Sequence, residues 1–510
     1  MAGKHGTEHM GQCERCRADH PYSPVVIVGN GPSAMCLSYF LSGRWPYYNG
    51  LGHPNEYLHD RLKDNTEKSL IEQDLQYLSS GLEGRSRHPV ALLFDTLQHP
   101  NADQGDRVPS RMEFKHHQDK SIPHVVLGSG LPGGAWWDLD ASVLTLSLGC
   151  WMELPGQDFK DWIANFRSKN ESHSPLSVNQ MDRATLGEVA RYYQSYVKEK
   201  NLEKYFLSHT LVTSVQRLEG KRIVNSESGE RETTCKKCFG LEGENLFEVK
   251  GIHRNVSCDC CKTFSILTKN VVVATGMLGR PNKLGVEGED LNFVKGKVQD
   301  LEAAIQGGDL GCACSRVIVV GAGLSAADAV QCCRNANIPV VHIFRRKASD
   351  PQIALARLPK AVYPEYHEIL ELMKGIKKDD KYTPLAEHVV EKFQSDHKVT
   401  VTGPQGSHTL QVSMAAVLIG SQPNLSFLPK EGRCMGFHKD QPISYKTNPL
   451  AVNPFTMEVI DEPGLFAMGP LVGDNFVRFS LGGALAITQH LVSKGLVDKQ
   501  TKNIESVASC

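Results

Sequence analysis

Two glycine-rich turns with the same spacing are the residues most able to do chemistry in this chain. The first, Gly29-Asn30-Gly31-Pro32-Ser33-Ala34, follows the β-branched run VVIV and opens an apolar helical stretch. Gly29 permits a sharp bend, Gly31 lets the backbone approach a pyrophosphate, and Ala34 allows the helix to pack closely on the strand. The helix N-terminus then offers free N–H groups and a positive partial charge to the phosphates. One such motif alone is weak evidence, because a purely structural turn has the same pattern.

The second turn repeats the first in the other half of the chain. It has the sequence GAGLSA, again follows a β-branched run and again precedes a helix. Its candidate binding residues are Gly321, Gly323, Ser325 and Ala326. Two matching turns are much harder to obtain by chance than one. They predict two bound dinucleotides, or one dinucleotide and a decayed copy of its site.

The strand after the second turn favours NADPH over NADH. In an NAD site an acidic side chain at the end of this strand binds the ribose 2′-hydroxyl. Here the strand VVHIF ends in Arg345 and Arg346. A guanidinium suits a phosphate dianion and cannot accept a hydrogen bond from a hydroxyl. The alternative is a pair of solvated surface arginines.

The same test at the first turn finds no acid in the expected place. The 20-odd residues after Ala34 contain no predicted strand. If HVVLG (124–128) is a displaced second strand, Gly128 and Ser129 stand where the acid belongs. Ser129 or backbone groups would then have to replace it.

The cysteines form a second kind of candidate site. The pairs Cys235/Cys238 and Cys258/Cys261 have the spacing of a four-thiolate structural zinc site. The alternative is a cysteine-rich surface loop, and Cys260 leaves open which thiol of the second pair is the ligand. With no export signal, the 15 cysteines are expected to be reduced thiols or metal ligands.

Two further cysteine groups are weaker candidates. Cys13, Cys16 and His20 could bind a metal, but they lie in a polar stretch with no periodicity, which favours no site. Cys332 and Cys333 are adjacent on a predicted helix, so both thiols cannot easily face one bound cofactor. A dithiol redox role is therefore disfavoured.

The elements around these residues predict an α/β fold. Buried strands at 25–28, 124–128, 269–276 and 316–320 alternate with helical segments, which is typical of parallel sheets. DFKDWIANF and TLGEVARYYQSYVKEKNL are predicted amphipathic helices, the second with a Thr N-cap. Residues 42–121 are long for a connection, so they are expected to form an insertion with its own structure. Within it, PVALLFDTL fits either a strand or the start of a buried helix.

Composition sets the remaining limits. A net charge of −1 gives no field that would attract nucleic acid, and no apolar run approaches the roughly 18 residues of a membrane span. The N-terminus has no apolar signal region. These features predict a cytoplasmic protein without a transmembrane segment.

The motifs resemble those of flavin-dependent monooxygenases: GNGPSA, PGGAW, VVVATG, GAGLSA, VLIGSQPN and MGPLVGDN with GGALA. A closer resemblance is to the oxidative stress-induced growth inhibitor family. It rests on long segments spread from Pro24 to about Leu491, among them GLEGRSRHPVALLFDTL, NIPVVHIFRR, LPKAVYPEYH and SQPNLSFLP. The Phe-Gly-His type signature of Baeyer–Villiger enzymes is not present before the second turn, which argues against ketone oxygenation.

The resemblance implies two Rossmann-like domains, with the NADPH-binding domain inserted in the FAD-binding domain. FAD would lie at the first turn, on Gly29, Gly31, Pro32, Ser33 and Ala34. Gly133, Gly134 and Trp136 would line the flavin ring, and Gly473 and Asp474 would lie under the ribityl chain. NADPH would lie at the second turn. The domain ranges are a tail at 1–23, the FAD-binding domain at 24–285 with its insertion 42–121 and Cys-rich segment 235–261, the NADPH-binding domain at 310–414, a return to the FAD-binding domain at 415–495, and a tail at 496–510.

The function implied by the resemblance is an FAD- and NADPH-dependent monooxygenase that uses O2. Its substrate would be a small molecule or a protein side chain. The family also implies a link to growth, differentiation and late cell division (cytokinesis), with the midbody as a further location. The alternative is a regulatory or scaffolding protein that keeps the fold and has little catalytic activity.

Overall fold

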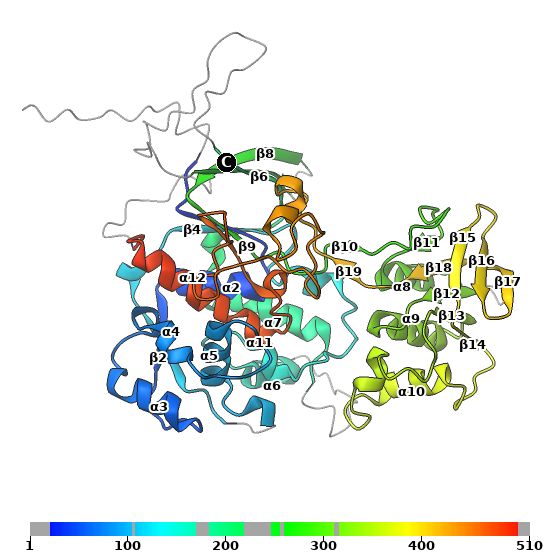
Figure 1. Ribbon diagram of the computed structural model, residues 1–510, viewed down its shortest axis with the longest axis horizontal. Helices are drawn as coiled ribbons and strands as arrows, with labels where there is room; N and C mark the ends of the chain where they lie inside the picture. Colours follow the sequence, from blue (N-terminus) through cyan, green and yellow to red (C-terminus); the bar gives the residue numbers. More distant parts are fainter. Residues whose placement is uncertain are drawn as a thin grey trace, which may run out of the picture.

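Buried, β-branched runs form the centre of two parallel sheets (Figure 1). The computed structural model describes residues 21–104, 108–169, 183–218, 246–255, 260–310 and 316–497. The first sheet has the order β20-β9-β1-β4-β5, and every pairing in it is parallel. Its strands are β1 (Val25–Val28), β4 (His124–Leu127), β5 (Phe206–Leu207), β9 (Asn270–Val273) and β20 (Leu465–Ala467). The β1 and β9 residues are all buried, as expected for a strand covered on both faces.

Helices cover the first sheet and join it to the insertion. The almost fully buried α2 (Pro32–Leu41) packs against α12 (Gly482–Ser493), which in turn packs against α5 (Pro89–Gln98). The other helices of this unit are α6 (Phe159–Lys169), α7 (Leu186–Glu199) and α11 (Val477–Ser480). The predicted Thr N-cap of α7 is confirmed, since Thr185 and Glu188 form a reciprocal capping box.

The segment 42–121 contains its own helices and strands. It contains the antiparallel strand pair β2 (Arg44–Tyr48) and β3 (Met112–His116), the helices α3 (Glu56–Leu62) and α4 (Leu75–Ser79), and α5. The ambiguous segment PVALLFDTL is therefore helical. Its apolar residues face α12 and α4, and Pro89 occupies the first helical turn, where a missing N–H costs nothing.

The second sheet has the order β11-β18-β12-β13-β14 and is also parallel throughout. Its strands are β11 (Val294–Lys295), β12 (Val317–Val320), β13 (Val340–Phe344), β14 (Tyr382–Ala386) and β18 (Met414–Val417). Alternate residues of β12 enter two different cores. One core lies under α8 (Val298–Gln306), α9 (Leu324–Asn335) and α10 (Pro364–Met373). The other lies under an antiparallel sheet.

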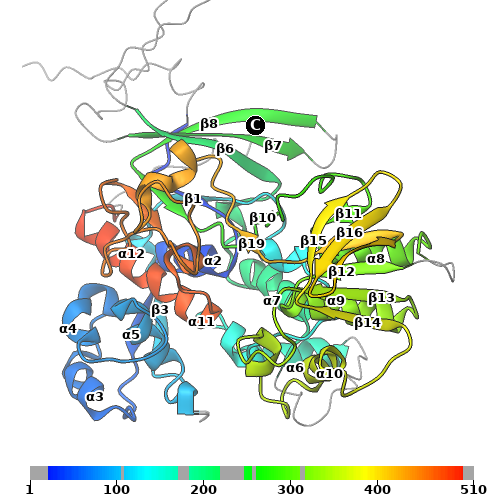
Figure 2. The same cartoon turned by 45° about the vertical axis from the view of Figure 1, so that its right-hand side comes forward.

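Each unit carries one such three-stranded antiparallel sheet (Figure 2). In the first unit it consists of β6 (Thr210–Arg217), β7 (Phe247–Asn255) and β8 (Cys260–Thr268). In the second it consists of β15 (Val389–Phe393), β16 (Lys398–Gly403) and β17 (Gly406–Gln411).

The chain crosses between the units twice, at β10 (Arg280–Pro281) and β19 (Ser421–Gln422), which pair antiparallel. The second unit thus lies in sequence between β9 and β20 of the first, which confirms the predicted insertion of one dinucleotide-type domain in another. Both β11 and β18 belong to the second sheet, so this unit extends beyond the 310–414 range on both sides. None of the helices in the described ranges combines the length and apolar character that a membrane span requires.

Candidate functional site

The first glycine-rich turn lies between the end of β1 and the start of α2. Gly29 has φ +108°, and a Cβ at this residue would lie 2.4 Å from the carbonyl oxygen of Ala274, just after β9. Its N–H donates to the carbonyl of Leu127 at 2.8 Å. Gly29 is therefore required by the two neighbouring strands.

Gly31 differs, because nothing in the protein requires a glycine there. It is the N-cap of α2, with φ −78° and ψ −174°, which any residue adopts. A Cβ at Gly31 would meet no atom within 4 Å. The helix N-terminus therefore faces open space that a side chain would occupy. This is the arrangement expected of a cradle for a pyrophosphate.

The second turn reproduces both features. Gly321 has φ +135°, and a Cβ there would lie 2.3 Å from the carbonyl oxygen of Leu418, just after β18. Gly323 is the N-cap of α9 with φ −93°, and its Cβ would again meet nothing within 4 Å. The two turns are therefore equivalent in geometry as well as in sequence.

The two turns differ in how far they are enclosed. In the first, Ser33 is 6 % exposed and Ala34 is fully buried. In the second, Ser325 is exposed, although Ala326 is fully buried. A ligand at the first turn would lie inside the protein, whereas one at the second could exchange with solvent.

The loop 130–134 lies directly against the first turn. Asn30 Nδ2 donates to the carbonyls of Gly130 and Leu131 at 2.9 and 3.0 Å, and the Asn30 carbonyl accepts from Gly133 at 3.1 Å. A Cβ at Gly134 would lie 3.3 Å from the Gly31 nitrogen. The structure thus brings Gly133 and Gly134 to the first turn, although they are about 100 residues away in sequence.

Asn30, which sequence reasoning did not single out, also explains the missing ribose acid. A Cβ at Gly128 would lie 2.0 Å from the Asn30 amide nitrogen. The residue directly after β4 must therefore be glycine, because the amide of Asn30 occupies the space where a side chain would begin.

Trp136 lies in the short 3-10 helix Gly134–Asp138 and is partly buried. Its ring meets the edge of Tyr193 on α7, with centroids 5.7 Å apart. The neighbouring Trp137 donates from Nε1 to the Pro132 carbonyl at 2.8 Å, which closes the loop on itself.

The segment after β20 completes the carboxyl edge of the first sheet. Gly473 has a left-handed backbone with φ +101°. Asp474 is buried, and its carboxylate accepts from Ser86 and His88 of the insertion. A Cβ at Gly469 would lie 2.7 Å from Ser33 Oγ, so this segment touches the first turn.

Behind the second turn lies a histidine that the sequence did not reveal as functional. His342 of β13 is fully buried; its Nε2 donates to the Gly321 carbonyl at 2.7 Å, and its Nδ1 accepts from the Tyr382 hydroxyl at 2.9 Å. Burial lowers the pKa of His342 to about 4, so the ring is neutral near pH 7. It therefore fixes the backbone of this turn without adding charge.

Arg345 and Arg346 follow β13 and are both exposed. Arg346 Nη1 donates to Asp350 at 2.7 Å and to Gln352 at 2.9 Å. The structure thus places both guanidiniums at the end of the strand next to the second turn.

A buried arginine joins the two units. Arg183 has no exposed side-chain surface; it donates to the carbonyl of Thr145 at 2.6 Å in the first unit. Its other partners belong to the second unit. Arg183 donates to the carbonyl of Val362 at 3.0 Å and to the carboxylate of Glu365 at 2.8 Å, and its guanidinium lies over the ring of Tyr363, 4.6 Å from the centroid. Part of the segment LPKAVYPEYH therefore serves as a contact between the units.

Carboxyl groups meet at the same contact. Asp140 of the first unit and Glu302 of α8 share a hydrogen bond, which requires a proton. Burial, that hydrogen bond and the charge of Asp140 raise the pKa of Glu302 to about 7. Burial is also the main cause that raises the pKa of Asp328 on α9 to about 7, against the lowering effect of the hydrogen bond from Tyr366.

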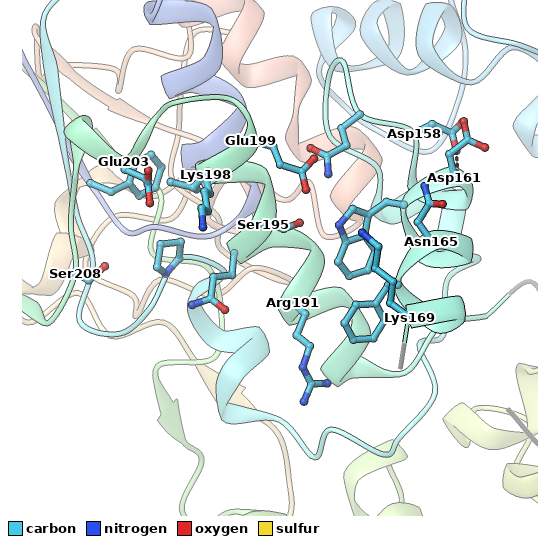
Figure 3. Close-up of a pocket in the computed structure, with 17 residues that line it drawn as sticks. Asp158, Asp161, Asn165, Lys169, Arg191, Ser195, Lys198, Glu199, Glu203 and Ser208 are labelled. Atoms are coloured by element: carbon cyan, nitrogen blue, oxygen red, sulfur yellow. Dashed lines mark hydrogen bonds between the residues drawn. The ribbon is translucent and has the colours of Figure 1, made fainter. Parts of the chain in front are cut away.

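A cavity of about 940 Å³ lies between α6 and α7 (Figure 3). Its lining carries Trp162 and Phe166 together with charges of both signs, among them Asp161, Arg191 and Lys198. Of the loop 130–134 it includes only Pro132. None of the residues that line this cavity belongs to either glycine turn.

The zinc prediction has no support in the described part of the chain. Cys235, Cys238 and Cys258 lie outside it, and Cys261 is an exposed free thiol. Within the described ranges, no three or more His, Cys, Asp or Glu side chains group as metal ligands would.

Comparisons with known proteins agree with this architecture. Residues 242–469 match the family model described as pyridine nucleotide-disulphide oxidoreductase. The bacillithiol disulfide reductase Bdr of Bacillus cereus is similar in structure, with a TM-score of 0.54 and 15 % identity over 93 % of this chain and 99 % of that one. The Staphylococcus aureus enzyme gives 0.53 and 13 %, with the same coverage. The chain therefore shares the fold of these two disulfide reductases.

Full-length relatives define the family more narrowly. Human (Homo sapiens) oxidative stress-induced growth inhibitor 2 is 44 % identical over 483 residues, which cover 92 % of this chain and 93 % of that protein. Mouse (Mus musculus) growth inhibitor 1 is 43 % identical, with 92 % and 95 % covered. The chain belongs to the oxidative stress-induced growth inhibitor family.

Proposed function

We propose that this chain is a monooxygenase that binds FAD at the first glycine turn and NADPH at the second. The observation that carries the proposal is the open space at Gly31 and Gly323. At both positions the fold tolerates a side chain, so a bound pyrophosphate gives the reason for glycine. The enclosed first turn suits a tightly held flavin, and the open second turn suits a coenzyme that must leave after each turnover.

The choice of NADPH rests on Arg345 and Arg346. Both are exposed at the end of β13, where the ribose of a dinucleotide on Gly323 would lie. Two guanidiniums there would attract a 2′-phosphate.

When bound, FAD would supply the chemistry, passing two electrons from NADPH to O2 so that one oxygen atom enters a substrate and the other leaves as water. The protein would bind, orient and shield. Asn30 holds the loop 130–134 against the first turn, and Gly133, Gly134 and Trp136 would cover the flavin ring. His342 keeps the second turn in place. The substrate would be a small molecule or a protein side chain.

The thiols of the second unit argue against a dithiol redox role for Cys332 and Cys333. Cys332 and Cys333 are free, and burial above all raises their pKa values to about 11 and about 12. Both are therefore protonated at neutral pH, whereas thiol–disulfide chemistry needs a thiolate.

In the cell, the names of the relatives suggest a role in growth control under oxidative stress, and we extend this to differentiation and cytokinesis. The proposed location is the cytoplasm, with recruitment to the midbody. A second candidate is a regulatory flavoprotein with weak turnover. It is favoured by Asn30, whose amide stands where a ribose-binding acid would start.

The experiment is to purify the full chain and record its absorption spectrum. A bound flavin that NADPH bleaches, and that O2 restores, supports the monooxygenase. A yellow protein that NADPH does not bleach favours the regulatory flavoprotein. A colourless protein that takes up neither FAD nor NADPH overturns both.

A further inference from the structure

The strongest feature outside the two glycine turns is a buried contact between the insertion and the C-terminal part of the first unit. Asp474 is 3 % exposed. Its Oδ1 accepts from Ser86 Oγ at 2.6 Å, and its Oδ2 accepts from His88 Nδ1 at 3.0 Å. Each carboxylate oxygen thus receives a charge-assisted hydrogen bond from the insertion.

Both donors are held by the start of α5. His88 is the N-cap of this helix, and its backbone N–H donates to Ser86 Oγ at 3.0 Å. The positive partial charge of the α5 N-terminus therefore lies close to the Asp474 carboxylate. Since Ser86 and His88 are tied to each other, they present their donors as one unit.

The helix that carries these donors cannot shift easily. A Cβ at Gly482, the first residue of α12, would lie only 2.3 Å from Cα of Ala91 on α5. The backbones of the two helices are therefore in direct contact. Because α12 begins eight residues after Asp474, both partners of the carboxylate contact rest on one rigid helix pair.

The contact lies at the first glycine turn. The N–H of Asp474 donates to the Gly469 carbonyl at 3.2 Å, and Gly469 packs against Ser33 of the turn. Ligands of parallel sheets bind at this carboxyl edge. An ionised carboxylate oxygen accepts about two hydrogen bonds, so each oxygen of Asp474 keeps a lone pair for a further donor.

We propose that Ser86 and His88 are positioning residues, which hold the Asp474 carboxylate ready to accept hydroxyl hydrogen bonds from the polyhydroxyl chain of a flavin at the first turn. The inference rests on the proposed function, and it gives the insertion a role in cofactor affinity. Without these donors the Asp474 carboxylate would lose the two hydrogen bonds that fix its orientation.

The test uses the full chain freed of flavin, with the Kd for FAD measured by quenching of flavin fluorescence well below the melting temperature of each variant. H88A should raise the Kd about tenfold, as expected for the loss of one charge-assisted hydrogen bond. H88N, whose amide nitrogen can take the place of Nδ1, should stay within about threefold of the wild type. S86A should raise the Kd about threefold to tenfold.

The matched control is H53A. His53 is in the same insertion and is 7 % exposed, close to the 8 % of His88, but it bonds to Thr96 and Asn55 and not to Asp474. H53A should lower the melting temperature and leave the Kd unchanged. Equal effects of H53A and H88A on the Kd, or no effect of H88A, would overturn the positioning role alone.

Two other outcomes are also decisive. If H88A does not fold, S86A and H88N still test the proposal, because wild-type affinity in S86A or a large loss in H88N contradicts it. If the wild type itself binds no FAD, the proposed function fails, and the positioning role fails with it.

Discussion

Replacing Gly31 with alanine should weaken flavin binding without harming the fold. A Cβ at this residue meets nothing within 4 Å, and its φ of −78° is one that alanine adopts freely. Alanine makes the unfolded chain less flexible and is a poorer N-cap than glycine; these two effects oppose each other, and each is about 1 kcal/mol or less. The melting temperature of the flavin-free protein should therefore change by less than about 3 °C.

The loss of affinity follows from the same geometry. The added methyl would occupy the space in which a pyrophosphate approaches the N-terminus of α2. Overpacking of a tight contact costs about 1–3 kcal/mol, which corresponds to a roughly 5- to 150-fold higher Kd for FAD. Fluorescence titration gives the Kd, and a thermal melt followed by circular dichroism gives the stability.

Two matched variants separate the ligand from the fold. Gly29→Ala puts a Cβ 2.4 Å from the Ala274 carbonyl at φ +108°, so this variant should be destabilised even without flavin. Gly323→Ala should weaken NADPH binding and leave FAD binding intact. The reasoning would be refuted if Gly31→Ala bound FAD as tightly as the wild type, or if it unfolded as readily as Gly29→Ala.

Three further predictions concern the second unit. Replacing both Arg345 and Arg346 with alanine should raise the KM for NADPH at least about tenfold and leave the KM for NADH unchanged, because only the contact with the 2′-phosphate is lost. Steady-state assays give both values. Equal changes for the two coenzymes would contradict a role of these arginines in binding the phosphate. The pKa of His342 is lowered from 6.5 to about 4, so the neutral ring stabilises the fold fully above pH 6.5, and this stabilisation is lost as the pH falls toward 4. That shift corresponds to about 3 kcal/mol. Between pH 7 and pH 4 the free energy of unfolding, measured with urea, should therefore fall by about 3 kcal/mol more in the wild type than in H342Q. Equal decreases in the two proteins would exclude His342 as the cause. The pKa of Glu302 is raised to about 7, so its hydrogen bond to Asp140 persists at lower pH and is lost as the pH rises through about 7. Proteolysis at the β10–β19 crossing should then be faster at pH 8.5 than at pH 6 in the wild type, beyond the protease's own pH response, but not in E302Q, which needs no shared proton.

The sequence by itself determined the two strand–turn–helix units and the parallel sheets around them. This was possible because each unit is local: a β-branched run, two glycines and a helix follow one another within about 20 residues, and steric limits on φ dictate glycine at the sharp bend. The arginines after β13 were predictable for the same reason. The insertion of one domain in the other was expected only through family resemblance, and the pairing of β18 with β12, which moves the domain boundary, depends on contacts far apart in the chain.

Only the tertiary structure decided which side chains surround the two turns. Asp474 meets Ser86 across 388 positions, and Arg183 meets Glu365 across 182. Such pairs leave no periodic trace, because they depend on how finished helices and sheets pack against each other. The same is true of Gly31: its spacing marks a turn, but only the empty space around it shows that the protein itself does not need a glycine there. The local sequence thus determines the backbone of the two glycine turns, and long-range packing determines which side chains surround them.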